Sequence, residues 1–137
     1  MIDIYYDMIE EIINTKYDKK MMVDLSFVDK DTIRRLNKDY RGLDKPTDVL
    51  SFSMVEGEYS ELAGDILGDV IICEDIVLEN SRENGVSFEE ELLRVIAHGT
   101  LHLIGYTHDK QEDYKSMVDI QESFVKKYIQ KLDKEDD

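Results

Sequence analysis

The histidines of this chain all fall within residues 98–108. The sequence holds three of them among its 137 residues, at His98, His102 and His108. On a helix, His98 and His102 would lie on one face, one turn apart. Gly105 suits the end of such a helix, so the chain can turn and bring His108 back towards the other two. Three neutral imidazoles at this spacing predict a zinc site with an open fourth position, which is typical of catalysis.

This spacing is that of the long zincin motif H-E-x-x-H-x-x-G-x-x-H, with one difference. Where a zincin metalloprotease carries its general-base glutamate, this chain has Gly99. The pattern therefore predicts a zincin-like metal site that lacks the base used in peptide hydrolysis. A chance cluster of surface or core histidines is the alternative. It would explain one histidine better than three at ligand spacing.

Length and composition limit the class of protein. We expect 1–137 to form a single domain around one core. No stretch approaches the roughly 20 apolar residues of a membrane span, and the first residues do not resemble a signal peptide. We therefore expect a cytoplasmic protein with no membrane partner. The single cysteine, Cys73, is expected to be a small buried hydrophobe and not a metal ligand.

The basic residues are unevenly distributed on this acidic chain. Its net charge of −15 opposes the binding of polyanions in bulk. Six of the 17 basic residues nevertheless fall within sixteen positions: Lys30, Arg34, Arg35, Lys38, Arg41 and Lys45. A local basic surface that binds nucleic acid is one interpretation. A solvated helix face is the other, and it is the one we expect for Lys30 and Lys38.

The segments that position these residues show both strand and helix patterns. Alternating apolar residues predict strands at 21–28, 49–55 and 66–73. Helical periodicity and capping residues predict helices at 6–14, 29–40, 74–84, from Ser87 through the first histidines, and 110–132. A short strand at 2–4 is a further option. Because the order is not strictly βαβ, we expect an α+β fold: a small mixed β-sheet flanked by helices, with a central helix carrying the metal-binding histidines.

Two blocks of sequence, supported by residues 67–73 between them, resemble a known family. The first is Leu36-Asn37 followed by Tyr40-Arg41-Gly42-Leu43-Asp44-Lys45-Pro46-Thr47-Asp48-Val49-Leu50-Ser51-Phe52, and the second is the histidine stretch 98–108. They resemble the YbeY family of bacterial metal-dependent endoribonucleases, which act in rRNA maturation. The resemblance implies a small mixed sheet flanked by helices, a metal usually assigned as zinc on the three histidines, and a loop arginine important for activity at Arg41. One departure is Thr107, where the family usually has Asp.

The function implied by this resemblance is that of a single-strand-specific endoribonuclease. It would act in 16S rRNA 3′-end maturation and in quality control of the small ribosomal subunit. The implied substrate is an rRNA precursor, and the implied partners are the small ribosomal subunit or its assembly factors. The residue chemistry agrees, because zinc lowers the pKa of bound water to about 7 and arginine pairs with phosphate through two hydrogen bonds.

The remaining candidates have weaker support. Lys45, Arg34 and Arg35 are expected to assist Arg41 along the RNA backbone, and Ser51 and Asp69 to line the site. For Ser51 and Asp69 a purely structural role is equally well supported. One zinc ion is the expected cofactor, with another divalent transition metal as the alternative. Two other functions stay open: a zinc peptidase or amidase, which Gly99 disfavours, and a non-enzymatic ribosome-assembly factor with a structural zinc.

Overall fold

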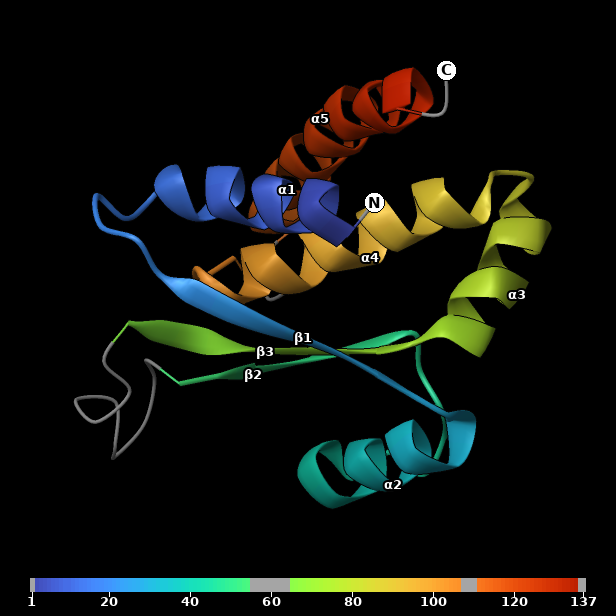
Figure 1. Cartoon of the computed structure of the whole chain (residues 1–137). Coiled ribbons are helices and arrows are strands. Elements are labelled where there is room, and N and C mark those ends of the chain that lie inside the picture. The colour runs from blue at the N-terminus through green and yellow to red at the C-terminus, as the bar shows by residue number, and fades with distance from the viewer. Residues whose placement is uncertain (1, 55–64, 107–110, 136–137) are drawn as a thin grey trace.

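The computed structural model describes residues 2–54, 65–106 and 111–135. These residues form an α+β fold, with three strands in one mixed sheet and five helices (Figure 1). The strands are β1 (Met22–Val28), β2 (Val49–Ser53) and β3 (Ile66–Cys73). The helices are α1 (Ile2–Asn14), α2 (Lys30–Arg41), α3 (Glu74–Asn84), α4 (Phe88–Leu103) and α5 (Gln111–Glu135). The predicted fold class is confirmed, with α4 as the central helix.

The sheet has the order β1-β3-β2, with β3 parallel to β1 and antiparallel to β2. Its register places Ser51 opposite Val70, and Phe52 and Asp24 on either side of Asp69. Because side chains alternate between the faces of a sheet, Val70 and Asp69 point to opposite faces. The face that carries Val70 is covered by α4, and the face that carries Asp69 is covered by α2 (Figure 1).

Helix α4 lies between the sheet and the helices α1 and α5 (Figure 1). It begins at the N-cap Ser87, whose Oγ accepts a hydrogen bond of 3.0 Å from the backbone N–H of Glu90. Helix α4 is buried along most of its length, as expected for a central helix, and it packs on α1, whose Met8 and Ile12 belong to the same large hydrophobic cluster. A smaller cluster of Ile33, Leu50 and Cys73 lies under α2. The predicted burial of Cys73 is confirmed.

Several boundaries differ from the sequence predictions, most of them by one residue. The optional strand at 2–4 is wrong, because these residues form the first turn of α1 and place Ile4 in the core beside Tyr5. Strand β2 ends at Ser53, before the predicted end at residue 55, which lies outside the described residues. Helix α5 extends to Glu135, past the predicted end at 132. No helix in the described part of the chain is both long and apolar enough to cross a membrane.

Candidate active site

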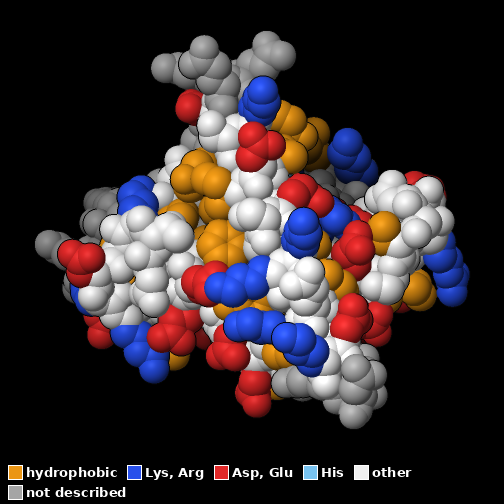
Figure 2. Space-filling model, turned by 90° about the horizontal axis from the view of Figure 1, so that it is seen from above, with side chains coloured by type: hydrophobic (Ala, Val, Ile, Leu, Met, Phe, Trp, Pro, Cys, Tyr) orange, Lys and Arg blue, Asp and Glu red, His pale blue; other side chains and the backbone are white. Residues whose placement is uncertain are grey.

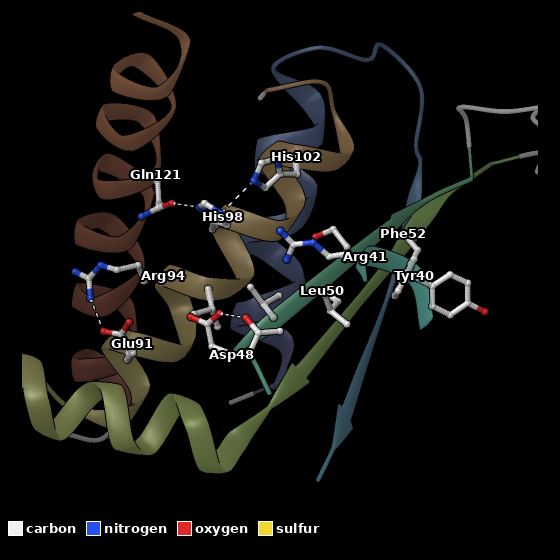
Figure 3. Close-up of a pocket in the computed structure, with 14 residues that line it drawn as sticks. Tyr40, Arg41, Asp48, Leu50, Phe52, Glu91, Arg94, His98, His102 and Gln121 are labelled. Carbon is white, nitrogen blue, oxygen red and sulfur yellow. Dashed lines mark hydrogen bonds and ion pairs between the residues drawn. The ribbon is translucent and has the colours of Figure 1, made fainter. Parts of the chain in front are cut away.

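A pocket of about 710 Å³ opens where β2 and the end of α2 meet α4 and α5 (Figure 3). Its lining includes Arg41, Ser51, His98 and His102, which the sequence analysis singled out. The other lining residues are Tyr40, Thr47, Asp48, Val49, Leu50, Phe52, Glu91, Arg94, Val95 and Gln121. The fold therefore brings the predicted arginine and two of the predicted histidines to one cavity, although they are almost 60 residues apart.

The two histidines face each other from successive turns of α4. Their Nε2 atoms are 3.1 Å apart, and the rings meet edge to face with centroids separated by 4.6 Å. Both side chains are half-buried. The third predicted ligand, His108, and the unusual Thr107 lie outside the described residues. Within those residues, no third His, Cys, Asp or Glu side chain completes a cluster that could hold a metal.

The turn after α4 fixes the orientation of His102. Gly105 has a φ of 110°, and its N–H bonds to the carbonyl of His102, while the N–H of Tyr106 bonds to the carbonyl of Leu101. This pair of bonds is a Schellman motif, so Gly105 ends the helix as its sequence position predicted. The turn also directs the carbonyl of Tyr106 to within 2.9 Å of His102 Nδ1. Because a carbonyl only accepts, Nδ1 carries the proton and Nε2 carries the lone pair when the ring is neutral.

Helix α5 fixes the orientation of His98. The Nδ1 atom of His98 lies 2.9 Å from Oε1 of Gln121. The amide of Gln121 is itself oriented, because its Nε2 donates a 3.1 Å hydrogen bond to Oε2 of Glu122. Oε1 therefore accepts from His98, which places the proton of His98 on Nδ1 as well. This role of Gln121 was not predicted from the sequence. The feature of the sequence that could have indicated it is a polar residue on the apolar stripe of α5, between Met117 and Val125.

Glu122 is held in turn by Arg94 of α4. The guanidinium of Arg94 donates to both oxygens of Glu122, with bonds of 2.8 and 2.9 Å, and to single oxygens of Glu90 and Glu91 at 3.1 Å. These bonds raise the pKa of Arg94. The hydrogen bond from Arg94, ahead of the smaller effects, lowers the pKa of Glu122. The charge of Arg94 is thus neutralised within the protein, although the residue lines the pocket.

The histidine pair fits a metal ion. With both protons held on Nδ1, two neutral rings would direct the lone pairs of their Nε2 atoms at each other across 3.1 Å. A cation or a proton between the two nitrogens would offset the repulsion between these lone pairs. The separation is close to the roughly 3.3 Å expected between two nitrogens bound to one tetrahedral zinc at about 2.0–2.1 Å. Hydrogen bonds from the second ring nitrogen to fixed acceptors are also usual for metal-bound histidines.

Gly99 faces the sheet and not the pocket. A Cβ atom at Gly99 would lie 2.9 Å from Ser51 Oγ and 3.0 Å from Cγ1 of Val70. The absence of a side chain lets α4 pack closely on the sheet at the level of the histidines. Ser51 occupies the space and donates a 3.1 Å hydrogen bond to the carbonyl of Gly99. A glutamate at this position would have to displace both neighbours. Close packing of α4 on the sheet therefore explains why residue 99 is a glycine and not the glutamate of a protease.

Arg41 reaches the same pocket from the C-terminal end of α2 (Figure 3). Its expected place in the loop is wrong: Arg41 is the last residue of the helix, and Gly42 follows with a φ of 73°. The buried Asn37 holds the loop through a 2.9 Å hydrogen bond to the carbonyl of Lys45. Among the described residues, Arg41 forms no salt bridge. None of the carboxylates in the described ranges neutralises its charge.

The other predicted side chains lie away from the pocket. Arg34 is exposed and forms two hydrogen bonds to Asp44, at 2.8 and 3.3 Å, and Arg35 and Lys45 are exposed without lining the cavity. Asp69 points to the sheet face under α2, where burial and then the Asp24 carboxylate raise its pKa. Two pocket carboxylates, Asp48 and Glu91, were not predicted from the sequence.

Comparison with known proteins identifies the family of this chain. The family model described as Endoribonuclease YbeY matches residues 2–129. An Endoribonuclease YbeY of Thermoanaerobacter sp. (strain X514) is 40% identical over 134 residues, covering 87% of this chain and 84% of that protein. Its counterpart in Clostridioides difficile (strain 630) is 42% identical over 113 residues, covering 81% and 74%. This chain belongs to the endoribonuclease YbeY family.

A solved structure shares the fold. The solution structure of TM1509 from Thermotoga maritima superposes with a TM-score of 0.68 at 33% identity, covering 98% of this chain and 85% of the other. The resemblance stated from the sequence blocks is thereby confirmed at the level of family and fold.

Proposed function

We propose that this chain is a metal-dependent, single-strand-specific endoribonuclease that acts on an rRNA precursor. The observation that supports this most directly is the convergence of the oriented pair His98 and His102 with Arg41 on one pocket. Membership of the endoribonuclease YbeY family supports the same reaction class. The proposed role is maturation of the 3′ end of 16S rRNA and quality control of the small ribosomal subunit, in the cytoplasm.

The proposed metal ligands are His98, His102 and His108, and the 3.1 Å contact between the Nε2 atoms of the first two supports the proposal. Zinc, or another divalent transition metal, would supply a bound water of lowered pKa, about 7 for zinc, at the scissile phosphate. Tyr106 and Gln121 accept from the Nδ1 atoms of these histidines, which would leave both Nε2 atoms as the donors to the ion. These two contacts preorganise the donor atoms before the substrate arrives.

Arg41 binds the scissile phosphate in this proposal. Its planar guanidinium can form two parallel hydrogen bonds to phosphate oxygens and can offset charge that develops in the transition state. Arg94, the other arginine that lines the pocket, is already bonded to three carboxylates. Ser51 keeps its hydroxyl on the carbonyl of Gly99, and we assign it the packing of α4 instead of a contact with RNA.

The peptidase or amidase alternative has less support. Its catalytic glutamate would replace Gly99, but that position faces Ser51 and Val70 at contact distance. The alternative of a structural zinc also agrees less well with the site, because the histidine pair lines an open cavity that an arginine enters. A ribosomal subunit or assembly factor remains the proposed partner, since a chain with a net charge of −15 gains little affinity for RNA from its overall charge.

The central experiment measures cleavage of a single-stranded RNA that carries the 3′ end of a 16S rRNA precursor. Wild-type protein loaded with zinc, manganese or no metal is compared with His98→Ala, His102→Ala and Arg41→Ala. We expect each variant to lose at least about 100-fold in kcat/KM, as for other groups that stabilise transition-state charge. Arg34→Ala is the matched control, because Arg34 lies on the same helix but pairs with Asp44. Equal cleavage by the parent and all three variants would refute the proposed site.

A further inference from the structure

An exposed aromatic side chain stands next to the proposed phosphate-binding arginine. Tyr40 precedes Arg41 at the end of α2, lines the same pocket and is 69% exposed. Its ring meets that of Phe52 edge to face, with centroids 5.1 Å apart and planes inclined by 69°. Tyr40 is therefore largely open to solvent, although Phe52 contacts its ring.

The surroundings of Tyr40 restrict the motion of its ring. Phe52 is half-buried in β2 and packs against the small cluster of Ile33, Leu50 and Cys73. Tyr40 itself lies in the last turn of a capped helix. Both rings are therefore held by regular elements and not by a loop. In Figure 3, Arg41 lies between the histidine pair and the Tyr40–Phe52 pair.

The size of the cavity agrees with a ligand larger than a phosphate group. At about 710 Å³ it is within the roughly 300–1,000 Å³ typical of small-molecule sites. Along the pocket the site offers metal-ligand nitrogens, then a guanidinium, then an open aromatic face. This order corresponds to a scissile phosphate and a base attached to the neighbouring sugar.

We propose that Tyr40, braced by Phe52, is a stacking platform for an RNA base next to the phosphate that Arg41 binds. The proposal rests on the proposed endoribonuclease function and adds a specificity determinant to it. Stacking on an aromatic ring tolerates any base, because every base has a π face. It needs an unpaired base, since a base inside a duplex already stacks on its neighbours. Tyr40 would thus favour single strands without reading sequence.

The test compares Tyr40→Leu, Tyr40→Phe and the parent on one short single-stranded RNA and on the same RNA with an abasic residue beside the scissile bond. On intact RNA, Tyr40→Leu should raise KM by about 5- to 100-fold, the range for loss of one stacked base, and change kcat little. Tyr40→Phe keeps the ring and should behave as the parent. Tyr6→Leu removes an exposed helical tyrosine outside the pocket and is the matched control.

The abasic RNA supplies the decisive comparison. The parent should bind the abasic RNA more weakly than the intact RNA. Tyr40→Leu and the parent should bind the abasic RNA equally well, because the base that would stack is missing. Equal KM for Tyr40→Leu and the parent on intact RNA, or an equal loss on both RNAs, would overturn the platform. Because Tyr40 is exposed, the melting temperature of Tyr40→Leu should match that of the parent and exclude misfolding.

This design separates the platform from the nuclease proposal. If the parent cuts RNA, His98→Ala does not, and Tyr40→Leu is unchanged, then the platform alone is wrong. If metal-loaded parent does not cut, equilibrium binding of the two RNAs replaces KM. A difference between intact and abasic RNA that disappears in Tyr40→Leu would then support the platform while the nuclease proposal fails.

Discussion

Gln121 links the proposed metal ligands to charges on two helices. Its amide oxygen accepts from His98, and its amide nitrogen donates to Glu122, which Arg94 holds. Every polar group in this series has a defined partner, so the ring of His98 has little freedom to rotate. Residues that accept a hydrogen bond from the second ring nitrogen of a metal-bound histidine commonly affect metal affinity as well as activity.

Replacing Gln121 with leucine should therefore weaken metal binding. We expect a loss of about 10- to 100-fold in zinc affinity, the usual range for removing such a hydrogen-bond partner. Competition with a chromophoric chelator measures this directly and does not require catalysis. Gln130→Leu, at an exposed position of the same helix, is the control. Unchanged affinity in Gln121→Leu would show that His98 is oriented by other contacts.

Asp69 gives a prediction that depends on pH. Burial, and then Asp24, raise the pKa of its carboxyl, so the folded state binds a proton more readily than the unfolded state. The ionised group consequently costs stability at neutral pH, and this cost disappears as the pH falls through its folded-state pKa. Asp69→Asn should raise the melting temperature at pH 7, and the gain should shrink on acidification.

A second measurement on the same variant tests the position of Asp69. RNA cleavage by Asp69→Asn should equal that of the parent, because Asp69 does not line the pocket. Asp39→Asn, which removes an exposed carboxyl from α2, controls for the change in net charge. A gain in stability that is independent of pH, or equal in both variants, would contradict the assignment.

At the scale of elements, two glycines allow α4 to approach the sheet. A Cβ atom on Gly68 of β3 would lie 2.3 Å from the backbone oxygen of Phe52 and 2.8 Å from Leu103 of α4. The corresponding atom on Gly99 meets side chains at 2.9 and 3.0 Å. Side chains can adjust more easily than a strand backbone, so the two positions differ in tolerance.

We therefore expect a ranked loss of stability. Gly99→Ala should lower the free energy of unfolding by about 1–3 kcal/mol, the usual cost of overpacking a core, and Gly68→Ala should cost more. Gly85→Ala is the comparison, because its Cβ would meet open space and only the φ of 68° is unfavourable, at a cost of about 1–2 kcal/mol. Urea denaturation measures all three. A Gly68→Ala protein no less stable than Gly85→Ala would contradict the packing argument.

Sequence patterns predicted the helices and strands better than the contacts between residues that are distant in the sequence. The limits of β3 and α3, the Ser87 cap and the Gly105 turn were all predicted, because they depend on local periodicity and backbone preference. The contact between Gln121 and His98 joins residues 23 apart, and a polar residue on an apolar stripe does not reveal its partner. The placement of Arg41 in a loop failed because the predicted helix ended at residue 40, whereas α2 includes Arg41 and has Gly42 as its C-cap.

At the scale of the whole molecule, charge opposes the proposed substrate. On the face shown in Figure 2, the Lys and Arg side chains near the centre are bordered by Asp and Glu side chains. The net charge of −15 adds a general repulsion of RNA. Affinity for RNA should then depend on few phosphate contacts, of which the contact with Arg41 is the best supported.

The salt dependence of RNA binding tests this view. Each phosphate contact on a single strand contributes about 0.7 to the slope of log K against log salt concentration. Arg41→Ala should therefore bind more weakly and reduce the slope by about 0.7, whereas Arg34→Ala should change neither. Fluorescence anisotropy with a labelled single strand, in the metal-free protein, gives both values. An unchanged slope in Arg41→Ala would remove the phosphate contact from the proposal.

The contact between Gln121 and His98 also has a consequence for how the protein is made. Because α5 follows α4 along the chain, α4 leaves the ribosome first, before the residue that orients His98 has been synthesised. The histidine pair thus acquires its final geometry only after α5 has emerged and packed on α4. A nascent chain that carries both histidines but not yet α5 would lack an oriented site, and we expect it to be inert towards the RNA of the ribosome that is translating it.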